Sequence, residues 1–181
     1  YLGAEEILRR QFLASVIDTL ARENHPAILS GGHDGGTAKT ALGATGEGSL
    51  ITTLCERIER DGALLVQAFT AAFQERTPAL DRLSSWVTQD AGAGPREMLQ
   101  RAAAEHRAES EQLHRQERQI REALPELKVA AERPNATEED TRAHRAAEGA
   151  RKAAESRIFD QDREHWVSAL ERHGILPNYT L

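Results

Sequence analysis

The chain has little of what builds a thick globular core, a disulfide framework or a membrane span. Of its 181 residues only 4% are aromatic and only one, Cys55, is a cysteine. A single cysteine excludes a disulfide framework and a thiolate metal site, and is compatible with a reducing cytoplasm. No run approaches the roughly 18 apolar residues that a membrane span needs, and the N-terminus lacks a signal-peptide pattern. We therefore expect a cytoplasmic protein with no membrane partner.

A basic excess is missing as well. The formal net charge is −6, and 29% of the residues are charged. Dedicated nucleic-acid surfaces normally show an excess of lysine and arginine, so the composition argues against one while leaving room for a local basic strip. Few aromatics beside many charged residues is a composition typical of long helices and coiled coils. The fold class that we predict is all-α.

The first 90 residues are predicted to form a small helical base. Apolar residues recur there at spacings of three and four, which is typical of amphipathic helices. Residues 30–48, rich in glycine, are predicted to be a flexible loop. The expected helices cover residues 4–23, residues 50–74 with Ser49 as the cap, and a short stretch that begins at Pro78 after the cap Thr77.

Residues 95–173 carry the most regular pattern and are predicted to form a long antiparallel coiled-coil hairpin whose far end returns to the base. Pro125 is expected to kink or end the first arm near Leu124, although the apolar spacing beyond it is compatible with a further turn. Thr137 is expected to cap an alanine-rich return helix that ends at His173-Gly174. Residues 174–181 are predicted to be an extended tail leading to a next domain. The heptad seam of the first arm has Leu99, His106, Leu113, Ile120 and Leu127 at one position and Ala103, Ser110, Glu117 and Leu124 at the other.

No catalytic, cofactor or metal site emerges from the spacing of reactive residues. The segment 31–40 is rich in glycine and ends in lysine and threonine, but alanine precedes the lysine and no strand precedes the loop, so it fails as a phosphate-binding loop. His106 and His114 lie eight residues apart, as do His165 and His173, whereas zinc-binding helices use a spacing of four. We expect neither an enzyme nor a bound cofactor or metal.

Arginines are the remaining candidates for an interface. They are interleaved with acids at helical spacing, which is typical of solvated, ion-paired helix faces. Arg115 and Arg118 on the first arm are candidate nucleic-acid contacts, and Arg9 and Arg10 are candidates because they lie near the start of the chain. The chain begins at Tyr1 without a methionine, and we expect it to be a piece of a larger polypeptide.

The two ends carry a resemblance to a known family. The opening Tyr-Leu-Gly-Ala-Glu-Glu-Ile-Leu-Arg-Arg-Gln and the closing Gly-Ile-Leu-Pro-Asn-Tyr-Thr-Leu resemble a segment of very large bacterial DEAD/DEAH-box helicases. The resemblance covers residues 1–20 and 167–181 only. In that family such a segment follows the two motor domains, which bind ATP and hydrolyse it, and precedes a C-terminal region that often bears a cysteine cluster.

The resemblance implies a non-catalytic helical accessory domain of an ATP-dependent, DNA-binding helicase of the DNA-repair or phage-defence type. None of the motor's own signatures is present in this sequence. The hairpin would act as a lever, a strand-engaging arm or a protein-docking arm, with the rest of the parent helicase, DNA or another protein as partner. The alternative is a coiled-coil interaction or oligomerisation module of an unrelated cytosolic protein.

Overall fold

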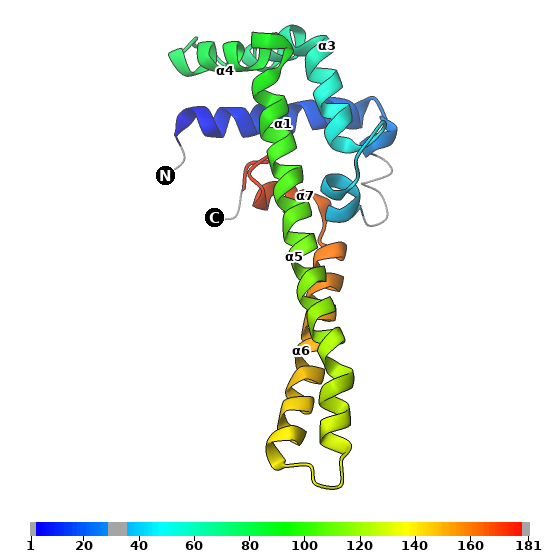
Figure 1. The fold of residues 1–181 in the computed structure, drawn as a ribbon. Helices are drawn as coiled ribbons and strands as arrows, with labels where there is room; N and C mark the ends of the chain where they lie inside the picture. Colours follow the sequence, from blue (N-terminus) through cyan, green and yellow to red (C-terminus); the bar gives the residue numbers. More distant parts are fainter. Residues whose placement is uncertain (1–2, 29–35, 179–181) are drawn as a thin grey trace. The chain divides into compact units, whose positions relative to one another are not determined.

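The structure, a computed structural model, describes residues 3–28 and 36–178, and in these ranges it contains helices and no strand. The all-α prediction is thereby confirmed. No helix of the described part is long and apolar enough to cross a membrane. The elements are α1 (Ala4–Arg22), the π-helical turn η1 (Lys39–Gly43), α3 (Leu50–Thr70), α4 (Pro78–Thr88), the short 3₁₀ turn η2 (Gln89–Ala91), α5 (Ala93–Glu132), α6 (Glu138–Arg163) and α7 (Trp166–Arg172) (Figure 1).

The described residues form two compact units. The first extends to His106 and resumes at Arg163, and the second, which we call the hairpin, is Arg107–Asp162. The predicted base covered residues 1–90 and the predicted hairpin covered residues 95–173, so the predicted boundaries differ from those of the two units. The first unit therefore includes the beginning of α5 and the whole of α7.

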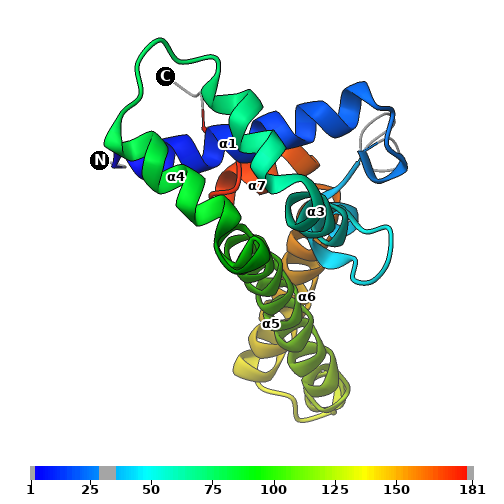
Figure 2. The ribbon, with the colours of Figure 1, turned by 90° about the horizontal axis from the view of Figure 1, so that it is seen from above.

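The core of the first unit is built around α1, which lies at the level between α4 and α7 (Figure 1); Figure 2 shows these helices from above. Phe12 and Leu13 of α1 are fully buried, and the ring of Phe12 meets that of Phe69 from α3 edge-on, with centroids 5.8 Å apart. Leu99 of α5 and Leu170 of α7 are also fully buried in this core. Burial of Leu99 is the physical reason why the first turns of α5 belong to this unit and not to the hairpin.

The helix starts follow the predicted caps. The hydroxyl of Ser49 accepts a hydrogen bond from the backbone N–H of Thr52 at 3.4 Å, and that of Thr77 accepts from Leu80 N–H at 3.4 Å. The second helix ends at Thr70, four residues earlier than expected. Because these side chains satisfy backbone donors that the first helical turn leaves unpaired, local sequence is sufficient to fix both starts.

The predicted flexible loop at residues 30–48 divides into two parts. Residues 30–35 lie outside the described ranges. From residue 36 onward the chain forms η1, in which Leu42 is fully buried, as is Ala38 just before it. The backbone N–H of Ala38 donates to the carbonyl of Glu164 at 2.8 Å. Packing and pairing with a distant segment therefore give regular structure to a stretch whose composition predicted none.

The hairpin consists of the remainder of α5 and nearly all of α6, which run antiparallel beside each other (Figure 1). Of the two outcomes predicted at Pro125, an end of the helix near Leu124 is wrong: α5 continues through Pro125 to Glu132, as the apolar spacing beyond the proline indicated. The half-buried Leu124 and Leu127 continue the seam across the proline, and this packing offsets the hydrogen bond that proline removes. At the return, Thr137 accepts from Asp140 N–H at 3.1 Å and donates its own N–H to that carboxylate at 2.8 Å.

The return helix is interrupted where sequence analysis predicted continuity. α6 ends at Arg163 and α7 begins at Trp166, because the intervening backbone pairs with residues 36–38 through the bridge of Thr37 with His165. The predicted glycine end is confirmed: Gly174 has φ +75°, and the N–H of Ile175 donates to the carbonyl of Leu170 at 2.8 Å.

The predicted tail at residues 174–181 begins as part of the core. Ile175 is fully buried and Leu176 is 8% exposed. Residues 179–181 lie outside the described ranges. The start of the predicted tail therefore contributes to the first unit, which differs from a linker that only leads to a next domain.

Candidate functional site

A cavity of about 310 Å³ opens in the first unit among α1, the beginning of α5 and the end of α7. Two of the four arginines predicted as interface residues, Arg9 and Arg10, line it, together with Trp86, Arg101, Glu105 and His173. Acidic and basic groups alternate around its wall. The cavity is therefore polar without being a strongly positive anion site.

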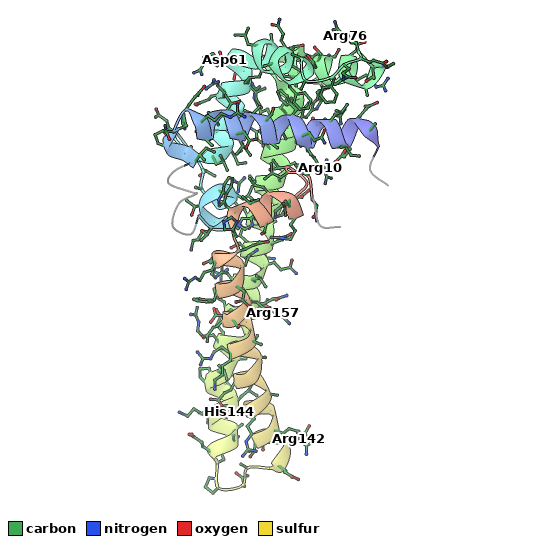
Figure 3. The ribbon with its side chains drawn as sticks, turned by 180° about the vertical axis from the view of Figure 1, so that it is seen from behind. Arg10, Asp61, Arg76, Arg142, His144 and Arg157 are labelled. Carbon is green, nitrogen blue, oxygen red and sulfur yellow. The ribbon has the colours of Figure 1, made fainter. Side chains whose placement is uncertain are left out.

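Arg9 and Arg10 are held by intramolecular contacts. The guanidinium of Arg9 lies 5.1 Å from the ring centroid of Trp86, and its Nη2 is 3.8 Å from a carboxylate oxygen of Glu5. Arg10 donates a 2.9 Å hydrogen bond to Glu6, and its side chain is only 15% exposed. A cation over an indole face contributes about 0.5–1 kcal/mol at such partly exposed sites. These two arginines form part of the wall of the cavity (Figure 3 labels Arg10).

Two glycines let the walls come together. A Cβ at Gly94 would stand 2.4 Å from the ring of Trp86, and a Cβ at Gly174 would stand 3.2 Å from the guanidinium of Arg10. Gly174 also has a positive φ that other residues rarely adopt. Gly94 is thus required by the close approach of Trp86, and Gly174 by its backbone conformation; in both cases the neighbouring side chain lines the cavity.

Two histidines meet beside this cavity although they are distant in the sequence. The rings of His106 on α5 and His173 after α7 are 5.7 Å apart between centroids and nearly perpendicular, at 84°. His106 is 3% exposed, and so is the side chain of His173. Nδ1 of His173 lies 3.7 Å from a carboxylate oxygen of Glu105. Sequence analysis compared histidines only by local spacing and had no signal that would pair these two.

Arg115 and Arg118, the other two predicted interface residues, belong to the hairpin. Both are exposed, and neither forms an ion pair with any residue that the structure describes. Three residues apart on α5, they lie on neighbouring turns of one helix face. Arg142 and Arg157 of α6 are likewise exposed (Figure 3). The four predicted arginines therefore fall into two groups, one engaged in a cavity wall and one available on the hairpin.

The cysteine is not among the residues that line this cavity. Cys55 is half-buried on α3, and burial raises the pKa of its thiol. A raised pKa lowers the fraction of thiolate, which is the nucleophilic form. The geometry thus favours a structural role for this thiol over a nucleophilic one.

Comparison with known proteins adds no relative. No protein-family model, curated protein or solved structure matches the chain.

Proposed function

We propose that this chain is a non-catalytic helical accessory domain of a large ATP-dependent bacterial helicase and that its hairpin engages a nucleic-acid strand. The observation that carries the proposal is the meeting of the two segments that bear the family resemblance. Arg10 in the first lies directly against Gly174 in the second, inside one compact unit. Arg107–Asp162 is a single continuous insertion between them. An accessory arm inserted in a helicase segment has this organisation.

The build of the hairpin suits an arm and not an enzyme site. Only Glu117 and Ala154 are buried among its residues, and the rest of its seam is half-buried. Two helices joined by one turn cannot enclose a substrate away from water, which most catalytic sites require. They do present two long solvated faces. Such a face can bind a nucleic-acid strand or another protein.

Arg115 and Arg118 supply the chemistry for a strand. A guanidinium matches the geometry of a phosphate and forms two parallel hydrogen bonds with it. Because neither arginine has an acidic partner among the described residues, contact with phosphate breaks no ion pair. Arg9 and Arg10 are already held by Glu5 and Glu6 and would have to exchange partners. The hairpin pair is therefore the better candidate for the nucleic-acid contact.

The test is fluorescence anisotropy with single-stranded, duplex and forked DNA across a salt series, with the whole 181-residue chain. The perturbing variant is Arg115→Ala with Arg118→Ala. Its matched control is Arg76→Ala with Arg82→Ala, which removes the same charge from two exposed arginines of the first unit that are ion-paired with Asp81 and Glu5.

The expected result is tighter binding to the fork, weaker binding by the hairpin variant, and no change in the control beyond the general loss of two charges. Each phosphate contact contributes about 0.7–0.9 to the slope of log affinity against log salt, so the slope should fall by about 1.5 in the hairpin variant. Equal losses in both double variants would assign binding to net charge and refute the role of the hairpin.

A coiled-coil oligomerisation module is the second candidate, and exposed apolar side chains favour it. Val129 on α5 is 56% exposed and Phe159 on α6 is 58% exposed. A second copy of the hairpin could cover them and complete a four-helix seam. Size-exclusion chromatography with light scattering distinguishes the two candidates. A mass near 20 kDa at all concentrations would exclude oligomerisation and favour the accessory arm. A doubling of the mass with rising concentration that Val129→Lys abolishes would support oligomerisation.

A further inference from the structure

We propose that His106 and His173 form a binding site for one transition-metal ion of the zinc class. A ligating nitrogen of His106 lies within 4.8 Å of a ligating nitrogen of His173. Both rings are buried, and they meet edge to face. The proposal is independent of nucleic-acid binding and departs from the sequence-based expectation of no metal, which rested on local spacing.

The two donors are presented by rigid backbone. His106 lies inside the long helix α5, and His173 closes α7 immediately before Gly174, whose neighbours complete the hydrogen-bonded helix end. Zinc binds imidazole nitrogen at about 2.0–2.1 Å, so two nitrogens on one tetrahedral ion lie roughly 3.4 Å apart. The nitrogens already lie within 4.8 Å of each other, so rotations of the two rings that shift them by about 1 Å bring them to that separation.

A carboxylate on α5 supplies the third ligand. Glu105 reaches to 3.7 Å from Nδ1 of His173 and keeps 52% of its side chain exposed, so it can turn toward an ion. A carboxylate that does not bind the ion can orient a ligating imidazole through its other nitrogen.

The ligands favour a transition-metal ion over magnesium or calcium, and the cavity gives such an ion a route of entry. Imidazole suits zinc, copper and nickel, whereas magnesium and calcium prefer sites made of oxygen ligands alone. His173 and Glu105 both line the 310 Å³ cavity, which provides access from solvent and room for a water in an open coordination position. Buried histidines also occur as simple polar core residues, so the experiment has to separate packing from ligation.

The first measurement uses the intact, metal-stripped chain and needs no variant. Histidine ring resonances are recorded by NMR during a Zn²⁺ titration at neutral pH. Of the seven histidines, only His106 and His173 are expected to shift, with saturation at one equivalent. Parallel titration with Co²⁺ should give the visible absorption of a four- or five-coordinate ion, and Mg²⁺ should shift neither ring. Absence of Zn²⁺-dependent shifts, or shifts confined to other histidines, overturns the proposal.

Calorimetry then identifies the ligands. His106→Asn and His173→Asn keep a polar side chain of similar size and are each expected to weaken Zn²⁺ binding by more than tenfold. His114→Asn is the control, since His114 is exposed on the same helix. Glu105→Gln tests the carboxylate as the third ligand and is expected to weaken Zn²⁺ binding as well. Unchanged affinity in both histidine variants, with helicity retained by circular dichroism, refutes the site.

Discussion

The contact of Gly94 with Trp86 gives a sharp prediction about how α4 and α5 are held together. Gly94 is the second residue of α5, and a Cβ there would stand 2.4 Å from two atoms of the indole ring and 2.8 Å from the carbonyl oxygen of Trp86. The ring could turn away, but it is also in contact with the guanidinium of Arg9. The carbonyl belongs to α4 and can move only if the two helices separate.

Gly94→Ala should therefore destabilise the first unit. Overpacking of this kind costs about 1–3 kcal/mol, and a clash with backbone belongs at the upper end of that range. The higher helix propensity of alanine returns at most about 1 kcal/mol. The expected net loss is about 1–2 kcal/mol, which lowers the melting temperature by roughly 2–4 °C per kcal/mol in a chain of this size.

Gly149→Ala is the matched control, because a Cβ at Gly149 in α6 meets nothing within 4 Å. Only the propensity gain remains there, so this variant should be more stable by about 1 kcal/mol. Urea unfolding followed by far-UV circular dichroism measures both variants, and tryptophan fluorescence, to which Trp86 and Trp166 both contribute, follows the first unit. If Gly94→Ala gains stability as Gly149→Ala does, the close approach of α4 and α5 is refuted.

Three further predictions concern the cap, the thiol and the acid response. Thr137→Ala should cost about 1 kcal/mol and speed hydrogen exchange in the first turn of α6, whereas unchanged exchange would refute the cap. Because burial raises the pKa of Cys55, iodoacetamide at mildly alkaline pH should alkylate the native chain more slowly than the urea-unfolded chain, and equal rates would contradict its burial. Hydrogen bonds from Arg57 lower the pKa of Glu23, so this pair stabilises the fold above the ordinary glutamate range and the contribution is lost as pH falls through the folded pKa. The urea midpoint of unfolding should therefore fall less in Arg57→Gln than in the unchanged chain when the pH is lowered from about 6 to about 3. An equal fall in both would show that the pair does not stabilise the fold.

Local signals were sufficient for most of the helices. Ser49, Thr77 and Thr137 cap the helices that they were predicted to start, and Gly174 ends the last one with its left-handed conformation. Each of these features depends on one side chain and the backbone within four residues. Such short-range chemistry is readable from sequence, and the 3.6-residue period then identifies which face is buried.

Features of the helices that depend on contacts with distant parts of the chain could not be predicted from the sequence. Pro125 lies inside α5 because seam packing continues across it, and α6 stops at Arg163 because the next backbone groups pair with residues 36–38. Periodicity carries no information about either contact.

The candidate sites divide in the same way. Arg9 and Arg10 were identified from their position in the chain, but the cavity that they line depends on Trp86 packing against a glycine. His106 and His173 come together only through the tertiary arrangement of α5 and α7, so comparison of histidine spacings could not pair them.

The most direct test of the central claim is the binding of the intact chain to forked DNA as a function of salt. A strand-engaging hairpin should bind weakly and with strong salt dependence, with a dissociation constant of about 10⁻⁴–10⁻⁶ M near physiological salt. Binding should tighten steeply as salt is lowered and should be tighter for the fork than for duplex. No binding at about 50 mM salt, where phosphate contacts are strongest, would contradict a strand-engaging hairpin.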